Sequence, residues 1–215
     1  MRALLVVAAL AGTAHAGEDG RELVGIVAGM RAGDGGGFAV VHTDYDPRGV
    51  TLGVNLEASL AYRLRAVMRL DGERPGAGLA YVLAPYATAY LMYKAEGFSE
   101  PEGEIEGSLA LARGPLVGSL TFGQDADARN RDVEAALAAR AEVGRGVFAG
   151  AMTRYRDALG TTGEALARDA FAGAVATLAI DRVAITAMAG AGGVQRTGGR
   201  FETGAAATLA IGAAF

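Results

Sequence analysis

The segment from Gly49 to Asp71, GVTLGVNLEASLAYRLRAVMRLD, alternates between two kinds of position over its whole length. All of its charged side chains fall on one parity, and the other parity holds only apolar residues. A helix would spread Arg63, Arg65 and Arg69 around its circumference, whereas a strand places them on one face. The segment therefore predicts β-structure with one apolar and one polar face.

Other segments show the same alternation. In EGEIEGSLALA, Ile105 and Leu109 alternate with glutamate and serine, and the stretch from Phe201 to Phe215 behaves likewise. The segment DVEAALAARAEV is rich in alanine and could form a helix by propensity. Its charged residues nevertheless share one strand parity, which favours a strand there too.

Short and long connectors alternate between these segments. The short ones carry Pro, Gly or Asp at positions suited to tight turns: DPRG (46–49), AP (84–85), RGP (113–115), VGRG (143–146) and IDR (180–182). The longer, more polar ones are AGDGGG (32–37), DGERPG (71–76), EGFSEPEG (96–103), GQDADARNR (123–131), DALGTTGEALAR (157–168) and GGVQRTGGR (192–200). This rhythm predicts an all-β, antiparallel up-and-down barrel with turns at one rim and loops at the other.

The segments give twelve predicted strands, and ten is the next alternative. Their approximate ranges are 21–31, 38–45, 50–70, 77–84, 86–95, 103–112, 115–122, 132–142, 147–156, 168–179, 183–192 and 201–215. Most have about the 9–11 residues that a tilted strand needs to cross a bilayer. The 50–70 stretch is too long for one crossing, so it either projects beyond the membrane or hides a turn near Leu60–Tyr62.

The first sixteen residues, MRALLVVAALAGTAHA, combine a positive residue, a short apolar run and a small-x-small ending. This is the pattern of a secretory signal peptide, and the apolar run is too short to span a bilayer. No linker or change in composition divides the remainder. We therefore predict a signal peptide over 1–16 and a single β-barrel domain over 17–215.

The composition narrows the function classes. The chain has no Cys, which excludes a disulfide framework and a thiolate metal site. Its net charge is −4, which argues against a nucleic-acid partner, since such proteins present a basic face. Glycine is abundant, at 33 residues, while proline is limited to five, a balance that suits close-packed strands and tight turns rather than disorder.

The apolar face of each strand could meet either a soluble core or lipid. In a soluble, lipocalin-like barrel the apolar face points inward, and in an outer-membrane barrel it points outward. The predicted export signal favours lipid, as does a polar face that holds Arg and Glu among small residues and few Lys. The soluble ligand-binding barrel stays as an alternative.

The last residues, TLAIGAAF, close an alternating strand on an aromatic side chain. Here the chain resembles bacterial outer-membrane β-barrel proteins, whose final strand is amphipathic and ends on an aromatic residue read by the barrel-assembly machinery. The resemblance implies that Leu209, Ile211 and Phe215 form this assembly signal and that the barrel lies in outer-membrane lipid. It also implies periplasmic short turns and outward-facing long loops.

Two further expectations follow from this topology. The last strand should pair with the first near Leu23–Met30, and aromatic residues should form girdles at the two membrane interfaces. The candidates for the girdles are Tyr62, Tyr81, Tyr86, Tyr90, Tyr93, Phe122, Tyr155 and Phe171.

The polar strand faces predict a charged lumen. Its candidate residues are Arg63, Arg65, Arg69, Glu104, Glu106, Glu134, Arg154 and Arg156. Acids and bases facing each other across a lumen can select small hydrophilic solutes, which predicts a narrow channel or passive transporter. The same charges, if paired, could instead fill the interior of a closed barrel that works as an adhesion or assembly scaffold through its loops.

Catalysis has little support in the sequence. His42 and Asp44 share one strand face and could pair, as in a rim-located hydrolase. The predicted topology, however, puts them near a periplasmic turn, away from the outer rim. We predict no catalytic residue, no metal site and no cofactor, and the oligomeric state stays open.

Overall fold

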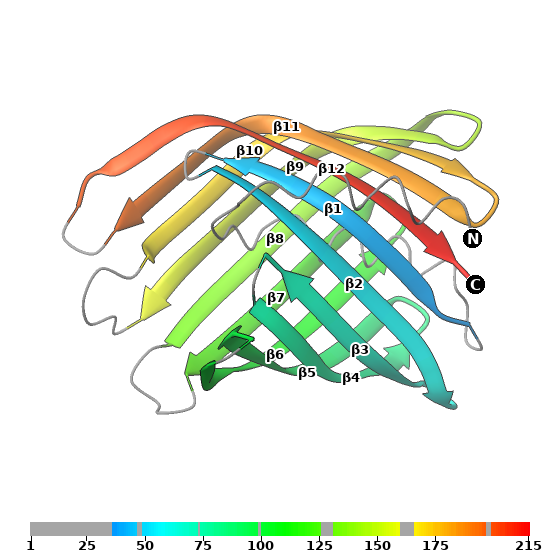
Figure 1. The fold of residues 1–215 in the computed structure, drawn as a ribbon. Helices are drawn as coiled ribbons and strands as arrows, with labels where there is room; N and C mark the ends of the chain where they lie inside the picture. The colour runs from blue at the N-terminus through cyan, green and yellow to red at the C-terminus, as the bar shows by residue number, and fades with distance from the viewer. Residues whose placement is uncertain are drawn as a thin grey trace.

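The alternating segments pair edge to edge into one closed antiparallel sheet of twelve strands (Figure 1). The computed structural model describes residues 36–46, 49–72, 74–98, 100–125, 131–159, 166–196 and 199–215. The strands are β1 (Phe38–Asp46), β2 (Gly49–Ala61), β3 (Leu64–Asp71), β4 (Arg74–Ala84), β5 (Ala87–Gly97), β6 (Glu100–Arg113), β7 (Leu116–Asp125), β8 (Arg131–Gly144), β9 (Val147–Leu159), β10 (Leu166–Ile180), β11 (Val183–Arg196) and β12 (Phe201–Ala214). Within these ranges, no helix is long and apolar enough to cross a membrane. The predicted fold class, an antiparallel up-and-down β-barrel of twelve strands, is confirmed.

The barrel closes through β1, and the prediction that the last strand pairs near Leu23–Met30 is wrong. Phe38 lies opposite Ala214, and the ladder continues to Tyr45 opposite Ala207. The partner of β12 is thus the segment 38–46, which the sequence analysis placed second. The strand predicted over 21–31 and the signal peptide predicted over 1–16 lie outside the described residues.

The long 50–70 stretch is two strands, β2 and β3, joined by a two-residue turn at Tyr62 and Arg63, which confirms the alternative of a hidden turn near Leu60–Tyr62. Arg63 adopts a φ of 62°. A non-glycine residue in this left-handed region is uncommon, and neither Gly nor Pro marks the turn. The turn is therefore hidden in an unbroken alternation, and the strand total stays at twelve.

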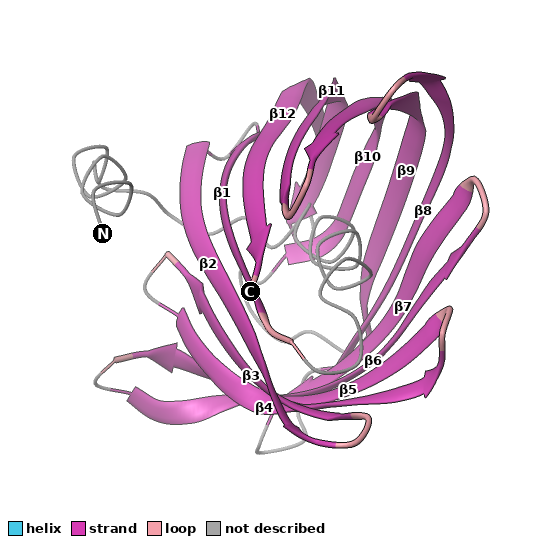
Figure 2. Ribbon diagram, turned by 90° about the vertical axis from the view of Figure 1, so that its right-hand side faces the viewer, coloured by secondary structure: helices cyan, strands magenta, loops and turns pink. Residues whose placement is uncertain are grey.

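The strand ends form two rims (Figure 2). The C-terminal rim holds Phe215 and the turns 62–63, 85–86, 114–115, 145–146 and 181–182. The other rim, here called the loop rim, holds the connections between β1 and β2, β3 and β4, β5 and β6, β7 and β8, β9 and β10, and β11 and β12. The short DPRG connector lies at the loop rim, because β1 starts beside Phe215, and its predicted place among the turns of the other rim is wrong.

The two faces of the sheet have inverted polarity relative to a soluble barrel. Large apolar side chains such as Leu120, Met68 and Leu91 lie exposed on the outside, with fractional exposures of 55–61%. Charged and polar side chains such as Glu57, Arg69 and Asn55 are buried on the inside. This arrangement fits a barrel whose outer surface meets lipid, and it is the reverse of the lipocalin-like alternative.

The exposed aromatic residues gather near the two rims. Tyr62, Tyr81 and Tyr86 lie at or beside turns of the C-terminal rim, and others lie near the loop rim. The second set is Tyr45, Tyr93, Phe122, Tyr155 and Phe201. Tyr90 and Phe171 were wrongly predicted as girdle residues, because their strand parity turns them inward, where they pack against the buried apolar residues.

The interior changes character along the barrel axis. Toward the C-terminal rim it is lined by small or apolar side chains, among them Phe38, Ala112, Val117, Ala138 and Ala210. Toward the loop rim it is lined mainly by ionisable side chains. The candidate functional site is therefore the polar half.

We expect the outward face to be sensitive to charge in a depth-dependent way. Leu120→Arg puts a guanidinium at the middle of β7, so the free energy of unfolding in phospholipid vesicles should fall by about 2–4 kcal/mol. Leu116 is the first residue of β7 and lies at the C-terminal rim, so Leu116→Arg should lower the free energy of unfolding by only about 0–1 kcal/mol. Urea titration followed by circular dichroism measures both, and equal losses at the two positions would contradict the assigned membrane band.

Candidate functional site

Seven of the eight predicted lumen residues lie on the inner face of the barrel. Arg65, Arg69, Glu104, Glu106 and Arg154 are buried, and Glu134 and Arg156 are partly buried. Arg63 is not on the inner face, so its prediction as a lumen residue is wrong. It lies in the β2–β3 turn at the C-terminal rim, with its guanidinium 5.1 Å from the centre of the Tyr62 ring.

The first charged cluster lies on β2 to β6. Glu106 takes part in two ion pairs, with Arg69 at 3.3 Å between Nη1 and Oε1 and with Lys94. The Arg69 guanidinium also lies 5.6 Å from the centre of the Tyr90 ring. Two neighbouring pairs extend the cluster toward both ends of the barrel: Arg74 with Glu104 at 3.8 Å, and Arg65 with Glu57 at 3.6 Å.

The second charged cluster lies on β8 to β10. The guanidinium of Arg154 pairs with the carboxylate of Asp169, and that of Arg156 pairs with Asp132. Arg154 and Asp169 are both buried. Nearer the loop rim, Arg168 pairs with Asp157 at 3.4 Å where both side chains meet solvent.

Most of these ion pairs join adjacent strands of the barrel wall. Arg154–Asp169 and Arg156–Asp132 each join adjacent strands, as does Arg65–Glu57. The longest reach, Arg69 to Glu106, goes from β3 to β6. The buried pairs neutralise charges whose burial would otherwise be very costly.

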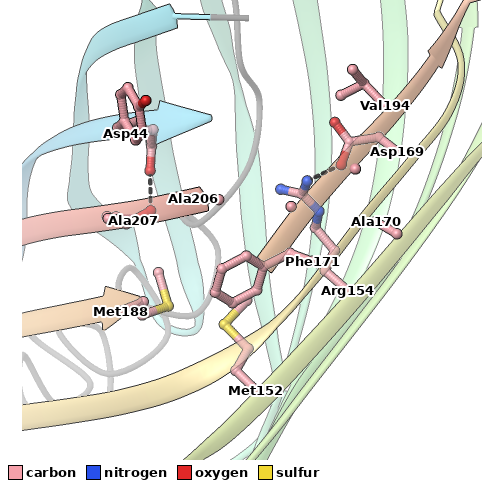
Figure 3. Close-up of a pocket in the computed structure, with 14 residues that line it drawn as sticks. Asp44, Met152, Arg154, Asp169, Ala170, Phe171, Met188, Val194, Ala206 and Ala207 are labelled. Carbon is pink, nitrogen blue, oxygen red and sulfur yellow. Dashed lines mark hydrogen bonds and ion pairs between the residues drawn. The ribbon is translucent and has the colours of Figure 1, made fainter. Parts of the chain in front are cut away.

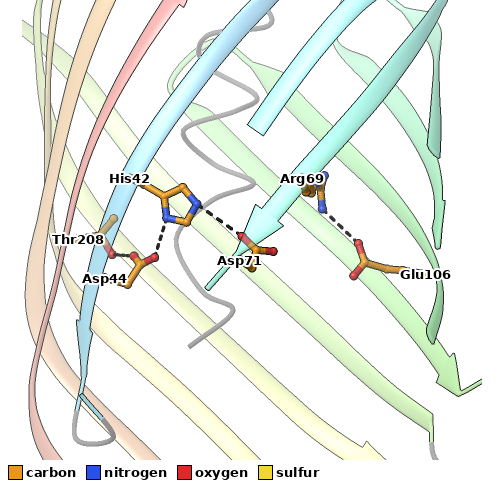
Figure 4. A network of polar contacts seen from close by, with 6 residues as sticks. All are labelled: His42, Asp44, Arg69, Asp71, Glu106 and Thr208. Atoms are coloured by element: carbon orange, nitrogen blue, oxygen red, sulfur yellow. Dashed lines mark hydrogen bonds and ion pairs between the residues drawn. The ribbon is translucent and has the colours of Figure 1, made fainter. Parts of the chain in front are cut away.

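A third polar group lies on β12, β1 and β3 and includes His42 (Figure 4). The Nδ1 atom of His42 lies 2.7 Å from an oxygen of Asp44, and the hydroxyl of Thr208 donates to the other oxygen of that carboxylate. On the opposite side of the ring, Nε2 lies 3.7 Å from Oδ1 of Asp71. His42 is 1% exposed.

The expected place of His42 and Asp44 near a turn of the C-terminal rim is wrong. Because β1 begins at that rim, His42 lies in mid-strand and Asp44 lies toward the loop rim. The polar contacts described for His42 are with carboxylates and not with a hydroxyl nucleophile.

A small cavity of about 30 Å³ separates this third group from the second charged cluster (Figure 3). Asp44 and Thr208 line one side, and Arg154 and Asp169 line the other. Met152, Phe171 and Met188 contribute apolar surface between them. In the described part of the chain, no group of three or more His, Asp or Glu side chains is arranged to hold a metal ion.

Sequence reasoning missed most of the partners of the predicted charges. The missed partners all lie on inward parities, and each pairs with a predicted lumen residue: Glu57, Arg74, Lys94, Asp132 and Asp169. The parity of Glu57 was readable, because it matches that of Arg65 and Arg69 in the same alternating segment.

Comparison with known proteins identifies the fold. No protein-family model matches the chain, and no curated protein is significantly similar in sequence. Among solved structures, the NanC porin is similar with a TM-score of 0.51 and 7% identity, over 80% of this chain and 98% of that one. The outer membrane channel DcaP of Acinetobacter baumannii gives 0.47 and 7% over 83% and 71%, and LpxR from Salmonella typhimurium gives 0.47 and 8% over 82% and 99%. The chain has the fold of bacterial outer-membrane β-barrel proteins, as the resemblance in its sequence implied.

The paired charges should contribute unequally to stability. Glu106→Gln leaves Arg69 and Lys94 buried without their shared carboxylate, so we expect the free energy of unfolding to fall by about 3–5 kcal/mol. Asp157→Asn is the matched control, because its partner Arg168 is 53% exposed and such pairs are worth less than about 1 kcal/mol. Urea unfolding in vesicles compares the two variants, and a small effect of Glu106→Gln would show that the interior is well hydrated.

Proposed function

We propose that this barrel resides in the bacterial outer membrane and acts as a narrow channel for small hydrophilic solutes. The observation that carries the proposal is the charged inner wall of the loop-rim half, within a barrel that is apolar outside. Acidic and basic side chains both line this wall and offer acceptors and donors to a hydrated solute. The fold shared with the NanC porin is consistent with this function.

The direction of the ion pairs supports a passage more than a plug. Side chains that pair with a neighbouring strand stay close to the wall, whereas a plug requires contacts between opposite walls. Arg154 with Asp169 and Arg156 with Asp132 follow the first pattern, and Arg69 with Glu106 is a longer reach from β3 to β6. Small side chains such as Ala110, Ala136 and Ala138 line the C-terminal half and take up little of the lumen.

A closed barrel that works through its surface loops is the second candidate. Its support is the deep burial of the inward-facing side chains, including small ones such as Ala210, together with the small size of the cavity beside Asp44. In that case the charges would serve to fill the interior. The two candidates differ in one measurable property, ionic conductance.

We expect the folded protein to give discrete conductance steps in a planar bilayer. Ala138→Trp introduces a large side chain on the inner face of β8 and should reduce the step size severalfold. Leu137→Trp introduces the same side chain one residue earlier on the lipid face, where Leu137 is 51% exposed, and should leave the step unchanged. Silence of the unmodified protein across voltages and salts would reject the channel and favour the closed barrel.

We further propose that the end of β12 is recognised by the barrel-assembly machinery. Leu209, Ile211 and Phe215 lie exposed on the outer face, on one parity of β12. The backbone of Phe215 exchanges two hydrogen bonds with Gly37, at 3.0 and 2.9 Å, so its ring is held at the C-terminal rim. An apolar edge of this kind offers a site for β-augmentation before the barrel closes.

Phe215→Ala should lower the amount of folded barrel in outer membranes of a bacterial host severalfold. Refolding of the same variant into vesicles should proceed normally, because the ring lies outside the packed interior. Phe201→Ala, at the other end of β12, is the matched control and should assemble at the normal level. Equal outer-membrane levels of both variants would contradict the assignment.

A further inference from the structure

Three residues in register bring an imidazole and a carboxylate together on the inner wall. His42 on β1 lies opposite Gly53 on β2, and Gly53 lies opposite Asp71 on β3. Because the central residue has no side chain, His42 and Asp71 lean toward each other above it (Figure 4). Their nearest polar atoms, Nε2 and Oδ1, are 3.7 Å apart.

Asp44 determines that Nε2 is the ring nitrogen of His42 that can act as an acceptor in this gap. Its carboxylate lies 2.7 Å from Nδ1 and so accepts a hydrogen bond from Nδ1–H. The hydroxyl of Thr208 donates to the same carboxylate and holds it in place. In a neutral ring this leaves the lone pair of Nε2 directed toward Asp71. Metal-binding histidines are commonly oriented in this way, by a carboxylate that accepts a hydrogen bond from the other ring nitrogen.

Nε2 of His42 faces Oδ1 of Asp71 across a gap that a bound electrophile can bridge. Nε2 is buried and has no hydrogen-bond partner among the residues that the structure describes, and 3.7 Å is too long for a direct hydrogen bond to Asp71. A tetrahedral metal ion bound at ordinary N and O distances holds its two ligand atoms about 3.4 Å apart. The observed separation is therefore close to what a bridging metal ion requires.

Gly53 provides the room for such an ion. A Cβ atom built on Gly53 would lie 2.2 Å from Nε2 of His42 and 2.9 Å from Oδ1 of Asp71. Any side chain at this position would therefore occupy the space between the two ligand atoms. A glycine in a strand interior often marks such a close approach.

We propose that His42 and Asp71 bind a divalent transition-metal ion on the inner wall of the barrel. His42 contributes Nε2 and Asp71 contributes a carboxylate oxygen, and water completes the coordination. Asp44 does not touch the ion and is a positioning residue that orients His42. The mixed imidazole and carboxylate ligands favour Zn²⁺ and its neighbours over Mg²⁺ or Ca²⁺. The site is independent of conductance, so a closed barrel could carry it as well.

Zn²⁺ binding to the untagged, folded full chain tests this proposal. Equilibrium dialysis with zinc chloride should give saturable binding of one ion per chain, and His42→Ala should abolish it. Asp71→Asn and Gly53→Ala should weaken binding strongly. Asp44→Asn should lower the affinity by about 10–100-fold while the stoichiometry at high zinc is kept. Asp157→Asn, which removes a carboxylate elsewhere on the barrel wall, is the matched control and should bind normally.

Nitrogen NMR of the labelled histidine separates a metal ion from a proton in the gap. Zinc should shift the Nε2 resonance of His42 at constant pH and leave Nδ1 protonated. A resonance that responds to pH but not to zinc would overturn the proposal, as would zinc binding that persists in His42→Ala. Gel mobility of unheated samples verifies that each variant is folded, and His42→Gln provides a second test should Gly53→Ala fail to fold.

Discussion

The antiparallel ladder between β1 and β12 is the interaction on which the rest of the structure depends. Inside a bilayer no water is present to satisfy a free strand edge, so a sheet spans the membrane only when it is closed. Phe38–Asp46 and Phe201–Ala214 provide that closure, and the backbone hydrogen bonds between Gly37 and Phe215 finish it at the C-terminal rim. Every inward or outward position around the barrel follows from this register, because a slip of one residue would turn each side chain to the other face.

Closure in lipid also dictates what the interior must contain. The apolar side chains are needed outside, so the polar parity of each strand turns inward and brings ionisable groups into a confined space. These buried charges are compensated by ion pairs. Glu106 pairs with both Arg69 and Lys94, and Arg154 pairs with Asp169 on the next strand. The charged clusters are thus a direct consequence of the alternation that specifies the strands.

The sequence predicted the fold class and the face assignment because both depend on a period of two residues, which is visible in the printed letters. It offered a turn near Leu60–Tyr62 as one of two explanations of the long 50–70 stretch but could not choose between them, since the left-handed backbone at Arg63 has no glycine to mark it. It also did not predict Lys94 as an inner residue. In β5, Tyr90 and Met92 share the inward face with Lys94, so both faces look apolar and the alternation disappears.

The period of two residues shows which face a side chain lies on, but it does not show which distant strands pair with each other. Asp44 and Thr208 are opposite each other only because β1 and β12 close the barrel, and the sequence analysis had assigned that place to another segment.

The group around His42 shows how closure and chemistry are linked. Thr208 comes from the last strand, His42 and Asp44 from the first, and Asp71 from the third. The two hydrogen-bonding partners described for Asp44 are an imidazole and a hydroxyl, rather than the guanidinium or ammonium groups found in the two charged clusters. This group thus brings carboxylates from β1 and β3 to the two sides of one imidazole at the closing seam. The strand pair that holds the barrel closed therefore also assembles this polar group on the inner wall.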